Sequence, residues 1–381
     1  MKIVYGDTGG RLSGLQQGKN QTLLGDPAQH TTIFGDAHVI TGFARGGNDR
    51  ITGGTNLESS ATLYGDAFKM STYAKGGNDI LDPGRQGITY GDAFSMVGLA
   101  RGGHDTLVSG TKGRYAELFY GDAKSMSGYT VGGNDTFNIT GWARALYGDA
   151  FDMSDHARGG NDVFNVDGAL NLHVYGDAHA MRGAARGGND RMSSGSSLFS
   201  ELHGDAHSMN GGARGGSDTL IGGNFNNKLY GDAYEMDGNT VGGNDTIIGG
   251  AVSPSGVYPD RLYGDAYSMS GKALGGNDRL VAGSDASDMW GDAALMLDQA
   301  AGGQDTFVFS GTFGETRIHD FHQGEDKLEI NVDPGLDPYK QVTWTTVGSD
   351  TAITITGPAS TGNVLLVGYA GPLGGGDFYF V

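Results

Sequence analysis

The chain has 381 residues, with 25 Lys or Arg and 44 Asp or Glu, which gives a formal net charge of -19 at pH 7. This acidity argues against nucleic acid as a partner, because nucleic-acid binding depends on neutralising phosphates. Cysteine is absent, which excludes disulfides and thiolate metal sites, and no apolar stretch is long enough to predict a transmembrane segment or a classical secretory signal peptide.

Residues 1–35 are predicted to form an N-terminal cap with degenerate repeats. Gly6-Asp7 and Gly25-Asp26 both resemble the start of the motif that follows, but neither is followed by its full pattern.

Residues 36–305 repeat one pattern ten times. Each copy has Gly-Asp-Ala followed by Gly-Gly-x-Asp, and the two aspartates are always thirteen residues apart, whereas the segments between copies vary in length. A segment of fixed length indicates a structural constraint, and a segment that tolerates insertions indicates a surface loop. The aspartate pairs are Asp36 and Asp49, Asp66 and Asp79, Asp92 and Asp105, Asp122 and Asp135, Asp149 and Asp162, Asp177 and Asp190, Asp205 and Asp218, Asp232 and Asp245, Asp265 and Asp278, and Asp292 and Asp305.

Each repeat alternates short apolar runs with turn residues. In one copy, Leu63-Tyr64 and Ile80-Leu81 flank turns rich in Gly, Asn and Asp, a composition typical of short strands joined by tight turns. A single copy cannot bury its apolar face, but stacked copies can. The sequence therefore predicts an all-β fold, a parallel β-solenoid (β-roll or β-helix) of about ten rungs of 26–33 residues.

Other residue types recur at fixed places in the repeat. Nine of the twelve methionines share one position, where Ile40 stands in the first copy, and this position is predicted to be an internal ladder. A tyrosine precedes most Gly-Asp-Ala motifs, and these rings are predicted to stack internally or at an edge, with an outward sugar-binding strip as the alternative. Basic residues before Gly-Gly, such as Arg45 and Lys75, are predicted to pair with neighbouring carboxylates.

Stacking in register would bring the twenty aspartates into two columns of like charge. Two such charges about 5 Å apart repel by about 1 kcal/mol in water and by more at a partly dry site. A divalent cation reverses the sign of this interaction, and hard oxygen ligands beside flexible glycine carbonyls favour Ca²⁺. The alternative is that the aspartates only cap turns through local hydrogen bonds. We therefore predict that all twenty are metal ligands and that the chain binds several calcium ions.

Segments such as Gly242-Gly243-Asn244-Asp245-Thr246-Ile247-Ile248-Gly249-Gly250 resemble the haemolysin-type calcium-binding (RTX) repeats. The resemblance implies a parallel β-roll with Ca²⁺ held by Asp carboxylates and Gly carbonyls, here Gly47 with Asp49 and Gly133 with Asp135. The rungs of this chain are longer than RTX nonapeptides, and the Gly-Asp-Ala aspartates have only a partial counterpart in that family.

Residues 306–381 are predicted to form a β-rich C-terminal cap. Ile318-His319-Asp320-Phe321 and the terminal Asp377-Phe378-Tyr379-Phe380-Val381 are similar to the C-terminal segment of type I secreted proteins such as serralysin-like proteases. This resemblance implies an uncleaved export signal recognised by type I secretion machinery. Asp320, Glu325 and Asp326 are predicted to form either one more metal site or a solvated acidic turn.

These patterns together predict a secreted, extracellular or cell-surface associated protein with a structural or adhesion role, which folds on binding Ca²⁺ outside the cell. No nucleophile elbow, phosphate-binding loop or zinc-protease motif is present, so no catalytic residue and no organic cofactor are predicted. Extracellular polysaccharide or a cell surface is the expected partner. The alternatives are a polysaccharide-acting enzyme and a glycan- or ice-binding module built on a solenoid face.

Overall fold

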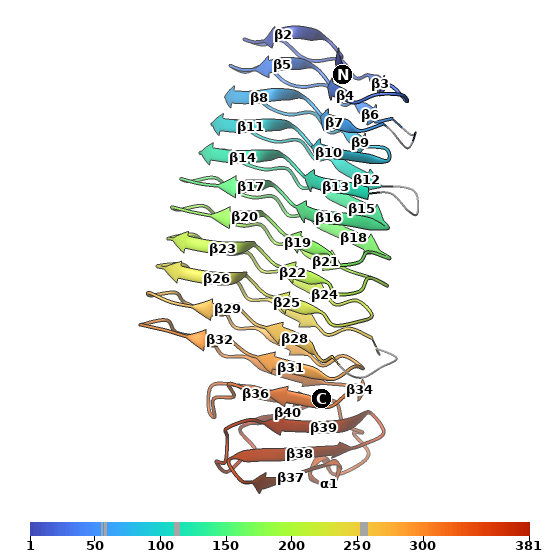
Figure 1. Ribbon diagram of the computed structural model, residues 1–381. Coiled ribbons are helices and arrows are strands. Elements are labelled where there is room, and N and C mark those ends of the chain that lie inside the picture. The colour runs from blue at the N-terminus through green and yellow to red at the C-terminus, as the bar shows by residue number, and fades with distance from the viewer. Residues whose placement is uncertain (55, 57–58, 110–114, 252–257) are drawn as a thin grey trace.

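The structure is a computed structural model that describes residues 1–381 except 55, 57–58, 110–114 and 252–257. The chain winds into an elongated stack in which each turn adds one strand to each of three parallel sheets (Figure 1). The predicted all-β parallel solenoid is thus confirmed. The second sheet contains eleven strands, so the stack has one turn more than the ten complete sequence repeats.

We number the sheets in the order in which the chain enters them. The first sheet begins with β1 (Lys2–Tyr5), β4 (Thr31–Phe34), β7 (Ala61–Tyr64), β10 (Gln86–Tyr90), β13 (Tyr115–Tyr120), β16 (Trp142–Tyr147), β19 (His173–Tyr175), β22 (Glu201–His203), β25 (Lys228–Tyr230), β28 (Asp260–Tyr263) and β31 (Ser287–Trp290). The second sheet comprises β2 (Thr8–Leu12), β5 (Ala37–Ile40), β8 (Ala67–Thr72), β11 (Ala93–Gly98), β14 (Ala123–Gly128), β17 (Ala150–Met153), β20 (Ala178–Met181), β23 (Ala206–Gly211), β26 (Ala233–Gly238), β29 (Ala266–Met269) and β32 (Ala293–Met296). The third sheet comprises β3 (Thr22–Leu24), β6 (Arg50–Thr52), β9 (Ile80–Asp82), β12 (Thr106–Ser109), β15 (Thr136–Thr140), β18 (Val163–Asp167), β21 (Arg191–Ser193), β24 (Thr219–Ile221), β27 (Thr246–Ile248), β30 (Arg279–Val281), β33 (Thr306–Phe309), β36 (Lys327–Ile330) and β40 (Phe378–Phe380).

Equivalent residues of successive repeats pair with one another. Tyr64 of β7 lies opposite Tyr90 of β10, and Met70 of β8 lies opposite Met96 of β11. Because neighbouring strands lie about 4.8 Å apart, each side chain stands directly beside its copy in the next turn. The repeat positions of the sequence therefore become continuous ladders along the long axis.

Two interior clusters run through the stack. Leu, Ile, Phe and Val side chains of the first and third sheets form one cluster, which continues into the C-terminal region. Alanine and methionine side chains of the second sheet form the other. The predicted methionine ladder is confirmed, and Ile40 takes its place in it, but Met296 is 40% exposed. Its strand, β32, is the last of the second sheet, so no further turn covers this side chain.

This ladder allows a matched pair of substitutions. Met153→Ala, at a fully buried position, is expected to lower the free energy of unfolding by about 2 to 5 kcal/mol, because it leaves a cavity between neighbouring turns. Met296→Ala removes the same atoms where the side chain is already 40% exposed, and less than about 1 kcal/mol is expected. Denaturant unfolding of both variants in the same buffer measures the difference. Equal losses would contradict an interior ladder.

The N-terminal segment forms the first turn of the stack. Gly6-Asp7 occupies the same corner as the Gly-Asp-Ala motifs, since the Asp7 amide donates to the Asp36 carbonyl as the Asp36 amide does to that of Asp66. Gly25-Asp26 is not a second copy of this corner, contrary to the sequence prediction. It follows β3 and lies where the chain passes from the third sheet back to the first.

The C-terminal region extends two of the three sheets. The first sheet continues through β35 (Thr316–Ile318), β39 (Ser360–Leu366), β38 (Asp350–Thr356) and β37 (Val342–Val347), with β34 (Gly311–Thr312) also pairing to β39. The pairs β37–β38 and β38–β39 are antiparallel, unlike the rest of the stack, and α1 (Pro338–Gln341) lies beside them (Figure 1). Within the described ranges, no helix is long and apolar enough to cross a membrane.

Candidate metal centre

The first aspartate column lies at the corner between the first and second sheets. In the turn made by β7, β8 and β9, the Asp66 carboxylate accepts a hydrogen bond at 3.0 Å from the Gly77 amide, eleven residues later in the same turn. The same contact recurs in every repeat, and all ten aspartates are at most 6% exposed. The donors are the amides of Gly47, Gly77, Gly103, Gly133, Gly160, Gly188, Gly216, Gly243, Gly276 and Gly303.

The second aspartate column lies just before the strands of the third sheet. Here the hydrogen bonds run between turns: the Asp79 amide donates to Asp105 Oδ1 at 2.7 Å, and the Asp105 amide donates to Asp135 Oδ1 at 2.7 Å. The other carboxylate oxygen, Oδ2, is buried without a hydrogen-bond partner at every position of this column. The ten residues concerned are Asp49, Asp79, Asp105, Asp135, Asp162, Asp190, Asp218, Asp245, Asp278 and Asp305.

Each unpartnered Oδ2 faces the glycine of a Gly-Asp-Ala motif. A Cβ atom at Gly65 would lie 2.2 Å from Asp79 Oδ2 and 1.7 Å from the Gly91 carbonyl oxygen of the next turn. The same two kinds of oxygen face Gly91, Gly121 and the equivalent glycines. Only glycine fits here, and its missing side chain leaves a carboxylate oxygen and a carbonyl oxygen turned toward one place.

The two columns are close enough to influence each other electrostatically. Burial, followed by the nearby Asp36 carboxylate, raises the pKa of Asp49 to about 7. Burial and the Asp292 carboxylate raise the pKa of Asp305 to about 9. In the middle of the stack the pKa of Asp135 is raised well above its ordinary value by burial and then by the charge of Asp122. Ionised carboxylates at these positions therefore lack compensating charge from the protein itself.

The donor set fits calcium in kind. The groups left without a hydrogen-bond donor are carboxylate Oδ2 atoms, which lie beside glycine carbonyl oxygens, and hard oxygen ligands are those that Ca²⁺ prefers. In the part of the chain that the structure describes, no three Asp, Glu, His or Cys side chains form a metal-binding group by themselves. An ion between the columns would therefore need glycine carbonyls, or water, to complete its shell of six to eight oxygens.

The residue before the second aspartate forms a separate ladder on the surface. The Asn78 amide donates to Asn48 Oδ1 at 3.0 Å, and the same pattern continues along the stack. Where His104 or Ser217 replaces asparagine, the side chain still accepts the next amide. This position therefore joins neighbouring turns, which explains why several residue types with an acceptor atom occur there.

The acidic residues of the C-terminal region are divided by the fold. Asp326 continues the second column, because its Oδ1 accepts the Asp305 amide at 3.0 Å. Asp320 accepts the amides of Gly291 and Asp292, and burial raises its pKa to about 7. Glu325 is exposed, so these three residues do not form one cluster.

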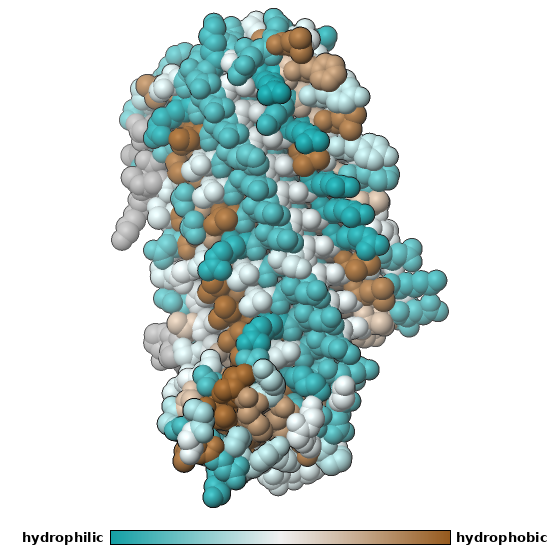
Figure 2. Space-filling view, turned by 180° about the vertical axis from the view of Figure 1, so that it is seen from behind, coloured by the Kyte–Doolittle hydropathy of each residue, from teal (hydrophilic) through white to brown (hydrophobic). Residues whose placement is uncertain are grey.

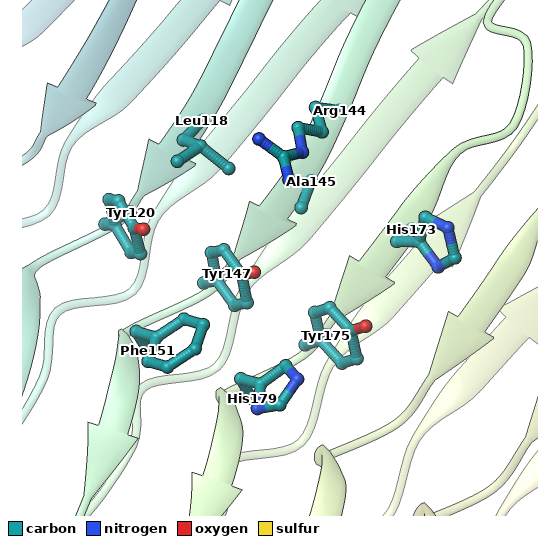
Figure 3. Close-up of a pocket in the computed structure, with 9 residues that line it drawn as sticks. All are labelled: Leu118, Tyr120, Arg144, Ala145, Tyr147, Phe151, His173, Tyr175 and His179. Carbon is teal, nitrogen blue, oxygen red and sulfur yellow. The ribbon is translucent and has the colours of Figure 1, made fainter.

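The tyrosine column forms a cluster distinct from the two interior clusters. Tyr64 and Tyr90 stack with ring centroids 4.9 Å apart, and this pattern continues through His203 and Trp290. A second column of rings, such as Phe151 and His179, packs edge-on against the first and lines a groove of about 380 Å³ with it (Figure 3). Because each ring face is covered by the next ring, this strip presents edges rather than free faces for sugar stacking.

The predicted pairing of the basic column with carboxylates is wrong. Its six members are exposed, and within the described chain none of them lies within ion-pairing distance of an acidic group. They are Arg45, Lys75, Arg101, Arg158, Arg186 and Arg214. Sequence reasoning failed here because the nearest aspartates point into the solenoid while these side chains point out.

A comparison with known protein families and with curated proteins found no match to this chain. The fold defines it as a parallel β-solenoid, and its distinguishing feature is the pair of buried aspartate columns.

Proposed function

We propose that this protein is a calcium-dependent, RTX-like structural or adhesion solenoid that folds on binding Ca²⁺ outside the cell. The observation that carries the proposal is the row of ten buried Oδ2 atoms without hydrogen-bond partners in the second aspartate column. Leaving a buried charged oxygen unpaired costs several kcal/mol, and ten such groups in one fold require a compensating partner.

The two columns and their glycines would hold the ions. Asp36 and Asp49 with Gly35 represent the arrangement in one turn, and the other nine pairs repeat it. Bound calcium would supply positive charge between carboxylates of neighbouring turns. Its binding free energy would then become folding free energy, since an unfolded chain does not hold these oxygens together.

The extracellular location is part of the same proposal. Calcium is scarce in cytosol and abundant outside cells, so a chain that needs it to fold would stay open for export and close afterwards. The resemblance of residues 306–381 to type I secreted proteins supports export by that route. A structural role, without catalysis, is favoured because the same geometry recurs in turn after turn and serves stacking rather than one distinct site.

Substitution of one buried aspartate tests the role of calcium. Asp135→Asn is expected to lower the free energy of unfolding in millimolar Ca²⁺ by about 2 to 3 kcal/mol, as expected for losing one well-filled site. Without calcium the same variant is expected to be as stable as the parent or more so, because a buried charge is gone and the new amide faces the Gly148 carbonyl. The measurement is denaturant unfolding, with calcium at neutral pH and with a chelator near pH 5, where protonation of the buried carboxylates is expected to stabilise the metal-free solenoid.

The control for this substitution is Asp237→Asn, which removes an exposed aspartate of β26. It should change stability by less than about 0.5 kcal/mol in both buffers. Equilibrium dialysis should show several calcium ions per folded chain and fewer in the Asp135→Asn variant. A folded protein that binds no calcium, or an Asp135→Asn effect of the same sign in both buffers, would disprove the proposal.

A further inference from the structure

The six-membered basic column runs along the corner that follows the second sheet. Arg45, Lys75 and Arg101 are joined by parallel bridges between successive turns, as are Arg158, Arg186 and Arg214, with Val131 between the two groups. Each residue is flanked by a buried alanine and a buried or half-buried glycine, so its side chain points away from the interior. The cations therefore repeat at the strand spacing of about 4.8 Å.

Among the residues that the structure describes, these cations have no acidic partner, although the protein has a net charge of -19. Some basic residues elsewhere on the surface have acidic partners, such as Arg182 with Asp152 at 2.7 Å and Arg279 with Glu329 at 2.6 Å. Six aligned cations without partners repel one another, and their alignment lowers stability slightly. Such a row of cations can bind the anionic groups of another molecule. Figure 2 shows that hydrophilic and hydrophobic residues gather in separate bands that run along the long axis.

An apolar row accompanies the first three cations. Two residues before each cation stands an exposed apolar side chain: Phe43 is 60% exposed, Tyr73 is 50% exposed and Leu99 is 42% exposed. Phe43 and Tyr73 stack with centroids 4.8 Å apart. A groove of about 510 Å³ is lined by the three cations and by Phe43 and Tyr73, together with Leu15, Gln16 and Gln17. No acidic residue of the described ranges lines this groove.

From this arrangement we propose that the basic column and its apolar row bind a linear acidic polysaccharide, with its chain lying along the solenoid axis. Carboxylate or sulfate groups would pair with successive cations, and Phe43 and Tyr73 would line the groove beside the sugars. The inference rests on the proposed function only in requiring the folded solenoid. It adds the partner that an adhesion or matrix role needs.

The charge spacing favours this ligand over nucleic acid. Double-stranded DNA carries one charge per about 1.7 Å of its axis, far denser than one cation per strand, and an acidic protein would be repelled by the excess. A polysaccharide with about one anionic group per sugar matches the row more closely. A membrane is a poorer fit because cations and rings line a shared groove, and because the second group of arginines continues without an apolar row.

The test is binding of chondroitin sulfate oligosaccharides, measured by calorimetry in calcium-containing buffer near physiological salt. The triple variant Arg45→Gln, Lys75→Gln and Arg101→Gln is expected to weaken binding at least about tenfold, and binding by the parent protein should fall steeply as salt is raised. The matched control is Arg50→Gln, Lys69→Gln and Lys272→Gln, which removes the same charge from exposed positions outside the column. It should bind like the parent.

Circular dichroism of each variant in the same buffer separates this inference from the calcium proposal. Loss of binding with an unchanged spectrum supports the inference, whereas equal losses in both triple variants would reduce it to a general charge effect and overturn it. Equal or tighter binding of single-stranded DNA, or of vesicles containing anionic lipid, would also overturn it. So would the absence of oligosaccharide binding by a fully folded parent protein. Neutral dextran is expected not to bind.

Discussion

Removal of calcium at pH 8 is expected to unfold most of the solenoid. Two carboxylates about 5 Å apart repel by about 3 to 4 kcal/mol at the effective dielectric constant that applies near a protein surface. At each step of both columns a metal-free carboxylate must either stay ionised beside its neighbour or take up a proton, and either costs free energy at pH 8. The net stability of a folded protein is only about 5 to 15 kcal/mol. The uncompensated columns alone can therefore outweigh the burial of the interior ladders.

Far-UV circular dichroism in EDTA, followed by addition of excess CaCl₂, measures this effect. The strand signal should be lost in the chelator and return with calcium. Magnesium at the same concentration should restore it poorly, because Mg²⁺ demands a small, regular octahedral shell. A compact and heat-resistant protein in EDTA at pH 8 would contradict the calcium-dependent fold. This conclusion would hold whether or not the protein binds polysaccharide.

Acid is expected to replace calcium in part. Burial raises the pKa of Asp36 to about 6 and that of Asp49 to about 7, so both bind protons more tightly in the folded chain than in the unfolded one. The resulting stabilisation is full below the ordinary aspartate pKa near 4 and is lost as the pH rises through 6 to 7. For Asp305, whose pKa burial raises to about 9, the loss extends to higher pH.

In EDTA the unfolding midpoint should therefore rise as the pH falls from 8 to 5. Each such carboxyl contributes up to about 1.4 kcal/mol per pH unit within its window, so Asp49→Asn should reduce the slope measurably between pH 5 and 7. In saturating calcium the trend should weaken or reverse, because protons compete for the ligands. A metal-free protein that loses stability on acidification from pH 8 to 5 would show that these aspartates are ionised without help from a cation.

The fold could be predicted because its constraints are local and repeated. The interval between the paired aspartates never changes because the first carboxylate binds an amide of the Gly-Gly pair across the same turn, as Asp66 does with Gly77. An insertion would break that contact. Stacking of identical turns then follows from the apolar positions, so the β-solenoid, the methionine ladder and the two aspartate columns are all visible in the spacing.

Other features depend on which way a side chain points and on what lies beyond the last turn. Met296 has the sequence position of a core residue but is exposed because the second sheet ends at its strand. Gly25-Asp26 has the first two residues of the Gly-Asp-Ala motif, but it lies at the corner between the third and first sheets rather than between the first and second. Arg45 and its equivalents follow aspartates in sequence, but their side chains point outward while those of the aspartates point inward. Within the described part of the chain they therefore have no acidic partner.

The sequence by itself determined the repeat, the class of fold and the residue types that line each ladder, because a strict period admits only one way of stacking. Only the tertiary structure decided that ten Oδ2 atoms are buried without hydrogen-bond partners and that the tyrosine rings cover one another's faces. It also decided that the basic column has no acidic partner among the described residues. These properties depend on distances between residues of neighbouring turns, which are some thirty residues apart in the sequence. A local sequence pattern therefore does not reveal them.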